Sequence, residues 1–151
     1  MAEPAKLPAT LLFACTYNRV RSPMARALTA RLFGARLFVE TCGVHTAQEA
    51  DPFMLEVMEE AGLDLRVHRP KTFDDLEDGS FDLVISLSPQ AQHRAVELAR
   101  HSATDILYWP TSDPTLTDGR REKILDSYRR TRDELEARIR GHFGAPSTFG
   151  G

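Results

Sequence analysis

A lone cysteine at the end of an apolar run is the first feature of this sequence that could do chemistry. Residues 9–23 read ATLLFACTYNRVRSP, so Cys15 follows the apolar residues and Arg21 comes six positions later, with Ser22 directly behind it. A thiolate is a strong nucleophile. A guanidinium presents a planar pair of donors that grips two oxygens of a phosphate-like group. The spacing therefore indicates a nucleophile beside a binding site for an oxyanion.

The residues between the cysteine and the serine are few enough to curl around one anion. Their backbone N–H groups can surround a tetrahedral oxyanion at a helix N-terminus, where the helix dipole adds positive potential. The same groups stabilise a negative sulfur, so we expect Cys15 to be ionised at neutral pH. Besides Cys15 and Arg21, the expected phosphate-binding loop contains Thr16, Tyr17, Asn18, Arg19, Val20 and Ser22.

Charge is unevenly distributed along the 151 residues. The formal net charge of -3 argues against a nucleic-acid binder, which needs a surplus of lysine and arginine. Between Pro4 and Val39 the chain has no Asp or Glu. The same stretch contains the cations Lys6, Arg19, Arg21, Arg26, Arg31 and Arg36. The surroundings of Cys15 should be locally positive and suit an anionic ligand, although Arg26 and Arg31 could equally form a solvated helix face.

Cysteine and histidine usage gives no sign of a metal site. Cys15 and Cys42 are the only cysteines, and the five histidines show no clustering of the kind that zinc sites use. We therefore expect no metal or other cofactor and no disulfide framework. No stretch reaches the roughly 18 apolar residues of a membrane span, and no secretory leader is evident. We expect a cytoplasmic protein without a membrane partner, because a reducing compartment suits a free catalytic thiol.

Strand-like and helix-like periodicities alternate along the chain, which is typical of βα units that build a parallel sheet. Strands are predicted at residues 10–14, 37–41, 81–87 and 106–109. Helices are predicted from Ser22 up to Gly34, from Asp51 up to Gly62, and at 88–100 and 120–143, with Ser22 as the cap of the first. Residues 66–80 should be irregular, and residues 1–8 and 145–151 flexible. One domain spanning 1–151 is expected, since the chain is too short for two cores.

In a parallel sheet, ligands bind beyond the carboxyl ends of the strands. That edge receives Cys15, the Thr41-Cys42 pair, the Leu87-Ser88 pair and the loop of residues 109–114. The residues that could take part in chemistry should therefore gather at this one edge of the sheet.

The C-x5-R-S pattern, directly after a strand and with SPM opening the helix, resembles the low-molecular-weight protein tyrosine phosphatases and the arsenate reductases that share their fold. The resemblance continues through TCGV at residues 41–44, GLDLRVHRPK at 62–71 and SDPT at 112–115, which looks like the family's Asp-Pro acid loop. It implies a three-layer α/β domain whose four-stranded parallel sheet, in the order 2-1-3-4, has helices on both faces.

The resemblance also implies a role for each site residue. Cys15 would attack phosphorus and form a phosphocysteine, while Arg21 and the loop N–H groups hold the equatorial oxygens. Asp113 would protonate the leaving oxygen and then activate water, with Pro114 as the rigid turn that aims it. Ser22 would stabilise the departing thiolate. Asn18, a residue that tolerates left-handed dihedrals, would pin the loop through its side chain.

The sequence departs from the family pattern at several positions near the site. Tyr17 replaces a common glycine and could form part of the pocket rim. Val20 replaces a second loop cysteine that could protect Cys15 as a disulfide. Arg26 replaces a glutamate. Thr115 and Leu116 follow Asp113-Pro114 where tyrosine phosphatases often carry aromatic residues, which puts a preference for aromatic substrates in doubt.

Three functions remain open from the sequence. The first is a cysteine-dependent phosphatase that acts on protein phosphotyrosine, phosphoarginine or a small phosphomonoester. The second is an arsenate reductase, which would need an external thiol because residues 87–100, LSPQAQHRAVELAR, lack the family's relay cysteines. The third is a non-catalytic anion sensor, which Tyr17 and Arg26 make plausible. Cys42 is interpreted as a core residue, with a redox partner for Cys15 as the alternative. The oligomeric state is left open.

Overall fold

Four parallel strands form one sheet at the centre of the molecule. The structure is a computed structural model and describes residues 3–77 and 80–144. The strands are β1 (Thr10–Cys15), β2 (Phe38–Gly43), β3 (Leu83–Ser86) and β4 (Asp105–Tyr108). They are ordered β2-β1-β3-β4, and each pair of neighbours runs parallel. The predicted fold class and strand order are confirmed.

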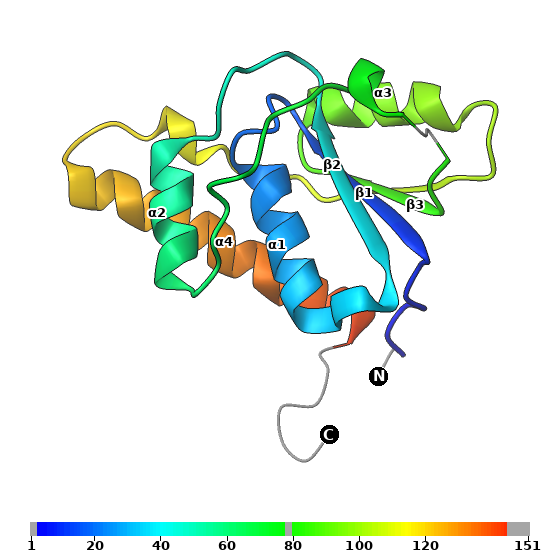
Figure 1. Cartoon of the computed structure of the whole chain (residues 1–151), viewed down its shortest axis with the longest axis horizontal. Helices are drawn as coiled ribbons and strands as arrows, with labels where there is room; N and C mark the ends of the chain where they lie inside the picture. Colours follow the sequence, from blue (N-terminus) through cyan, green and yellow to red (C-terminus); the bar gives the residue numbers. More distant parts are fainter. Residues whose placement is uncertain (1–2, 78–79, 145–151) are drawn as a thin grey trace.

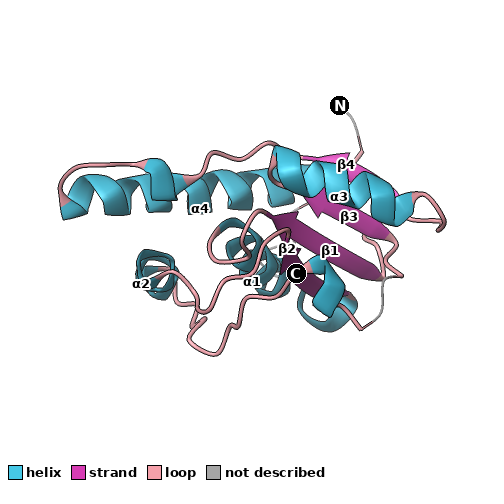
Figure 2. Cartoon of the chain, turned by 90° about the horizontal axis from the view of Figure 1, so that it is seen from above, coloured by secondary structure: helices cyan, strands magenta, loops and turns pink. Residues whose placement is uncertain are grey.

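Helices cover both faces of this sheet (Figures 1 and 2). The helices are α1 (Arg21–Phe33), α2 (Pro52–Glu60), α3 (Pro89–Ala99) and α4 (Arg121–Phe143). α1 and α4 pack on one face, with α2 against α4, whereas α3 packs on the other face against β1, β3 and β4. The predicted helices and strands are all present, and their ends differ from the predictions by at most two residues. None of these helices combines the length and the apolar character that crossing a membrane requires, over residues 3–77 and 80–144.

The alternation of side chains along β1 divides the core into two clusters. Leu11, Phe13 and Cys15 belong to the larger cluster, which α1, α2 and α4 cover. Leu12 and Ala14 face the opposite way into the smaller cluster beneath α3. Because β1 is buried on both faces, its sequence is a continuous apolar run rather than an alternating one.

The start of α1 differs from the prediction that Ser22 caps the helix. The N-cap position is occupied by Val20, and no side chain caps the helix there. Ser22 lies inside the first turn and is fully buried. Its hydroxyl contacts the sulfur of Cys15 instead of a backbone N–H group. The sequence pattern located the helix start correctly, but the capping role that it gave the serine is wrong. The contact with the sulfur agrees with the role that the family resemblance implied.

Two segments that were expected to lack regular structure make specific contacts. The flexibility predicted for residues 1–2 and 145–151 concerns positions outside the described part of the chain. Among residues 3–8, the Ala5 N–H donates to the His142 carbonyl at 2.8 Å, and Leu7 packs against the larger cluster. The irregular segment after α2 contains a short 3-10 turn, η2 (Phe73–Asp75), and Thr72 forms a bridge with Gly43.

The last residue of β2 approaches the loop after β1 unusually closely. A Cβ atom at Gly43 would lie 2.7 Å from the backbone nitrogen of Asn18 and 2.8 Å from the carbonyl carbon of Tyr17. Real Cβ atoms essentially never come that close to backbone. The Gly43 N–H also donates to the Lys71 carbonyl at 2.8 Å. Gly43 therefore lets three backbone segments meet at the carboxyl edge of the sheet.

This crowding predicts that Gly43→Ala destabilises the protein and displaces the loop. We expect a loss of about 1–3 kcal/mol in the free energy of unfolding, measured by urea denaturation, as for other overpacked sites. Gly141→Ala is the matched control, because nothing lies within 4 Å of a Cβ at that helical position. It should be neutral or stabilising by about 0.5–1 kcal/mol. Equal stability of Gly43→Ala and the parent protein would contradict the close approach.

Candidate active site

The loop between β1 and α1, residues 15–22, is called the anion loop below. Cys15 ends β1 with only 2% of its surface exposed, and its Sγ lies 2.9 Å from the Ser22 Oγ. Asn18 Nδ2 donates to the same serine oxygen at 2.7 Å. Because that oxygen already accepts a hydrogen bond from Asn18, the Ser22 hydroxyl is free to donate to the sulfur. The contact therefore places a hydroxyl donor against the sulfur of Cys15.

Asn18 holds the anion loop in a shape that most residues would resist. Its φ is 59°, and it is the only non-glycine residue with a positive φ in the described ranges. Its Oδ1 accepts from the Lys71 N–H at 3.0 Å, and its carbonyl oxygen lies 2.8 Å from His68 Nε2. The expectation that Asn18 adopts left-handed dihedrals and bonds through its side chain is met. Its partners His68 and Lys71 had not been anticipated, because nothing in the periodicity of residues 66–80 marks them.

Arg21 is fixed by carbonyl groups from the neighbouring strand ends. Its Nη1 donates to the Thr111 carbonyl at 2.9 Å and lies 3.5 Å from the Leu87 carbonyl. Its Nη2 lies 3.4 Å from Thr16 Oγ1. The residue is 7% exposed, so the guanidinium is buried and oriented from one side. Arg21 also lines the cavity described below.

Asp113 reaches the same place from the loop after β4. It caps a 3-10 turn, η3 (Pro114–Leu116), and its Oδ1 accepts from the Thr115 N–H at 3.0 Å and from the Thr115 hydroxyl at 2.6 Å. Its Oδ2 lies 4.0 Å from Arg21 Nη2, and about a quarter of the side chain is exposed. One carboxylate oxygen is therefore held by the turn, while the other faces the guanidinium.

Cys15, Arg21 and Asp113 share one cavity of about 670 Å³. Tyr17, Arg19 and Val20 of the anion loop also line it, so Tyr17 does form part of the wall. The wall further includes residues 46–49, Asp51, Pro52, Phe53, Thr115 and Tyr128. The structure thus brings six of the nine sequence-predicted residues to one space, whereas Thr16, Asn18 and Ser22 are not among its lining residues.

The other departures from the family pattern have separate places in the structure. Tyr17 is half exposed, and its ring centroid lies 5.5 Å from that of His45. Leu116 is exposed and does not line the cavity, whereas Thr115 does. Arg26 donates from Nε to the Val39 carbonyl at 3.1 Å, which ties α1 to β2. Arg26 therefore has a structural contact away from the cavity.

Cys42 lies on the opposite face of the sheet from Cys15. In the β1–β2 ladder Cys42 pairs with Ala14, and Cys15 pairs with Gly43. Cys42 is fully buried in the smaller cluster, whereas Cys15 belongs to the larger one. Burial raises the pKa of the Cys42 thiol, and the neighbouring Cys15 raises it further. The interpretation of Cys42 as a core residue is favoured over that of a redox partner for Cys15.

Asp51 and Tyr128 are cavity residues whose mutual contact sequence reasoning missed. Asp51 was expected only to open a helix, and Tyr128 only to lie within the helix predicted at residues 120–143. The structure joins them, with the Tyr128 hydroxyl donating to Asp51 Oδ2 at 2.9 Å. They are 77 positions apart, so no local pattern could have revealed the contact.

The sequence matches one protein family over most of its length. The family described as low molecular weight phosphotyrosine protein phosphatase matches residues 10–145. An arsenate reductase of Halalkalibacterium halodurans is 30% identical over 86% of this chain and 91% of its own length. A low-molecular-weight protein tyrosine phosphatase from T. tengcongensis is 26% identical, with a TM-score of 0.70 over 86% of this chain and 94% of that one. A mutant of the YwlE arginine phosphatase with a phosphorylated active-site serine is 26% identical, with a TM-score of 0.69 over 87% and 91%.

The contact between His68 and the anion loop predicts a specific pH dependence of stability. Burial lowers the pKa of His68 below its usual range, partly opposed by the bond to the Asn18 carbonyl, and Arg26, Lys71 and Arg69 lower it further. A histidine with a lowered folded-state pKa contributes stability that is present above its unfolded pKa of about 6.5 and is lost as pH falls through the folded value.

The free energy of unfolding should therefore fall more between pH 7 and pH 5 in the parent protein than in His68→Gln. Glutamine can still donate to the carbonyl but does not titrate. His142, whose pKa burial also lowers, is present in both proteins, so the difference between them isolates His68. Parallel pH profiles from urea denaturation would count against this assignment.

Proposed function

Because this chain belongs to the low-molecular-weight phosphotyrosine protein phosphatase family, we propose that it is a cysteine-dependent phosphatase that hydrolyses phosphomonoesters. Protein phosphotyrosine is the leading substrate class. The observation that carries the proposal is the convergence of Cys15, Arg21 and Asp113 on one cavity, with Ser22 Oγ 2.9 Å from the sulfur. A nucleophile, an oxyanion-binding group and an acid in one space are what phosphoryl transfer through a covalent intermediate requires.

The first step transfers the phosphoryl group to the enzyme. The Cys15 sulfur attacks phosphorus, so an S–P bond forms while the P–O bond to the leaving group breaks. Arg21 Nη2 and the backbone N–H groups of the anion loop hold the equatorial oxygens, whose charge needs fixed donors in the transition state. Protonated Asp113 gives its proton to the leaving oxygen. Its Oδ2 is the suitable donor atom, since Oδ1 is engaged by Thr115.

The second step returns the enzyme to its starting state. A water molecule attacks phosphorus and gives its proton to the Asp113 carboxylate, and the S–P bond breaks to release inorganic phosphate. The departing sulfur takes both electrons of that bond. The Ser22 hydroxyl, oriented by Asn18, stabilises this thiolate as it forms. A reducing compartment such as the cytoplasm would keep the sulfur available for the next cycle.

The cavity and the relatives guide the choice of substrates. A space of about 670 Å³ is far larger than a phosphoryl group and admits the side chain that carries it. Tyr17 and Phe53 supply aromatic wall surface, which supports an aryl ester although Thr115 and Leu116 replace the aromatic residues of the acid loop. The similarity to the YwlE arginine phosphatase makes phosphoarginine the second substrate to test.

Arsenate reduction is a second candidate, because curated relatives of this chain are named arsenate reductases. Arsenate has the shape and charge of phosphate, so the same loop would hold it. Cys15 would displace one oxygen of arsenate as water to form an S–As(V) bond. An external thiol would then attack the sulfur, forming a mixed disulfide while the electron pair of the S–As bond passes to arsenic and releases arsenite. A second thiol would reduce that disulfide. The position of Cys42 on the other face supports an external thiol as the reductant.

The phosphatase proposal predicts a dependence on the leaving group. Asp113→Asn should lower kcat by about 100-fold or more for phenyl phosphate, whose leaving group needs a proton, and much less for p-nitrophenyl phosphate. Cys15→Ser should abolish turnover of both. Equal losses for the two esters would exclude Asp113 as the acid. Phosphate binding without turnover of aryl phosphate or phosphoarginine would instead indicate the non-catalytic anion sensor.

The arsenate candidate predicts which thiol is needed. Any release of arsenite from arsenate should require added glutathione, mycothiol or thioredoxin and should survive Cys42→Ala, because Cys42 lies on the opposite face of the sheet. Comparing kcat/KM for arsenate with that for a phosphotyrosine peptide decides which activity dominates. Loss of arsenite release in Cys42→Ala, with the fold shown intact by urea denaturation, would contradict the external route.

A further inference from the structure

Asp51 lines the cavity and joins three segments through its carboxylate and its backbone N–H. Its Oδ1 accepts from the N–H groups of Phe53 at 2.8 Å and Met54 at 3.2 Å, which caps α2. Its Oδ2 accepts from the Tyr128 hydroxyl of α4 at 2.9 Å, and its own N–H lies 3.4 Å from the Arg19 carbonyl of the anion loop. Asp51 is 7% exposed. A buried carboxylate needs such partners, because an unpaired one is costly.

Tyr128 is suited to be a permanent donor to this carboxylate. It is 2% exposed, and its ring centroid lies 5.5 Å from that of Phe53. Burial raises the pKa of the phenol, and the negative charges of Asp51 and Asp113 raise it further. The hydroxyl therefore stays protonated. Tyr128 also lines the same cavity as Asp51 and Asp113.

The helix that carries Tyr128 also holds the turn that carries Asp113. We call residues 113–117 the acid turn. Thr117, at its end, shares a hydrogen bond of 2.7 Å with Ser127, the residue before Tyr128, and η3 packs against α4. The acid turn is thus attached to the same part of α4 that Asp51 holds. Fixing Tyr128 against Asp51 fixes the acid turn relative to α2 and the anion loop.

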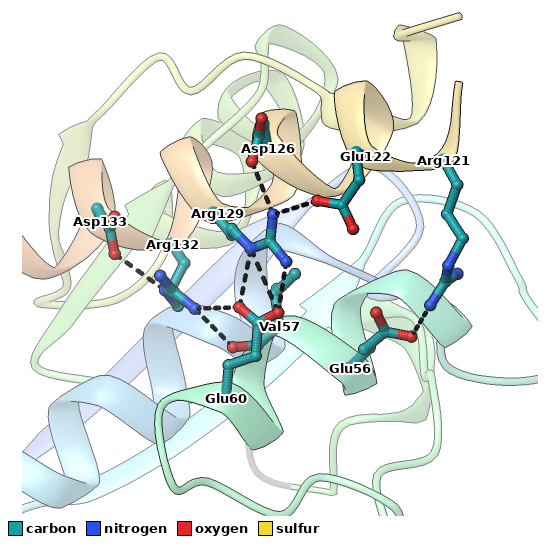
Figure 3. Close-up of polar contacts among 9 residues, drawn as sticks. All are labelled: Glu56, Val57, Glu60, Arg121, Glu122, Asp126, Arg129, Arg132 and Asp133. Carbon is teal, nitrogen blue, oxygen red and sulfur yellow. Dashed lines mark hydrogen bonds and ion pairs between the residues drawn. The ribbon is translucent and has the colours of Figure 1, made fainter. Parts of the chain in front are cut away.

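A second set of contacts joins α2 to α4 farther from the cavity (Figure 3). Arg129 pairs with Glu60 at 2.7 Å, and Arg132 donates to the Val57 carbonyl at 2.7 Å. Arg121 pairs with Glu56. The carboxylates of this outer set are more than a third exposed, so solvent screens these ion pairs. The hydrogen bond from Tyr128 to Asp51 is buried and has a charged acceptor, so the inner contact should dominate.

We propose that Asp51 and Tyr128 are positioning residues that set the place of Asp113 relative to Cys15. The proposal rests on the role of Asp113 as the acid. Neither residue is required to touch the reacting atoms. Their contact holds α4 and its acid turn against the start of α2. The Oδ2 atom of Asp113 therefore stays beside Arg21.

Tyr128→Phe tests the proposal, with Glu60→Gln as the matched control on the same helix pair. A displaced Asp113 delivers the proton to the leaving group less well. The kcat for phenyl phosphate should therefore fall about tenfold. KM should stay within about twofold, and kcat for p-nitrophenyl phosphate should fall less. Glu60→Gln should leave all of these constants near those of the parent protein. Equal kinetic effects in the two variants, or none in either, would overturn the proposal.

Amide hydrogen exchange provides a measurement that does not depend on activity. Exchange at Thr115, Leu116 and Thr117 should speed up about tenfold or more in Tyr128→Phe and stay unchanged in Glu60→Gln, since looser attachment permits local opening. Unchanged exchange in Tyr128→Phe would refute the positioning role even if the protein hydrolysed no ester. An inactive parent protein with faster exchange in Tyr128→Phe would refute the proposed function alone.

The double variant Tyr128→Phe/Asp51→Asn separates positioning from stability. Asparagine removes the buried unpaired charge and can still cap α2 through its oxygen, so the urea midpoint should recover part of the loss seen in Tyr128→Phe. The deficit in kcat for phenyl phosphate should remain, because the bond between α2 and α4 is still absent. Recovery of kcat together with the midpoint would show that both residues act only through stability.

Discussion

The hydrogen bonds that join Asn18, Ser22 and Cys15 are the contacts on which the candidate site depends. Asn18 occupies the serine oxygen as a donor, and this leaves the serine hydroxyl to face the sulfur. All three residues are buried, so bulk water competes little with these bonds. In a buried setting, a hydrogen bond to a sulfur is electrostatically stronger than the same bond would be in water. The surrounding elements of the fold keep these three side chains in contact.

The support for this chain of contacts comes from segments far apart in the sequence. Gly43 at the end of β2 admits the anion loop because it has no Cβ atom. His68 and Lys71 hold the backbone carbonyl and the side chain of Asn18. On the other side, the carbonyls of Leu87 and Thr111 hold Arg21. The carboxyl ends of all four parallel strands thus contribute, which is where this class of sheet binds its ligands.

Much of this arrangement could be predicted from the sequence, and the limits have physical causes. The apolar runs of β1 and β3 and the Ser-Pro and Asp-Pro pairs are local signals, and they located the strands, the helices and the acid loop. The identity of Cys15, Arg21 and Asp113 as cavity neighbours followed from their spacing and from the family resemblance. The capping role predicted for Ser22 was wrong, because capping preference is local, whereas the contact with Cys15, which only the family resemblance implied, depends on how the loop folds back. The contact of His68 with Asn18 joins positions 50 residues apart, and the bond between Asp51 and Tyr128 joins positions 77 apart. No periodicity in the sequence encodes such contacts.

The reactivity of Cys15 tests most directly whether the loop holds a negative sulfur beside an oxyanion. We would measure its alkylation by iodoacetamide at pH 7 by mass spectrometry, in the parent protein and in Ser22→Ala, with and without inorganic phosphate. The account predicts rapid modification of Cys15 and not of the buried Cys42, protection by phosphate, and slower modification in Ser22→Ala. Slow alkylation of Cys15 that neither phosphate nor the loss of the Ser22 hydroxyl changes would contradict it.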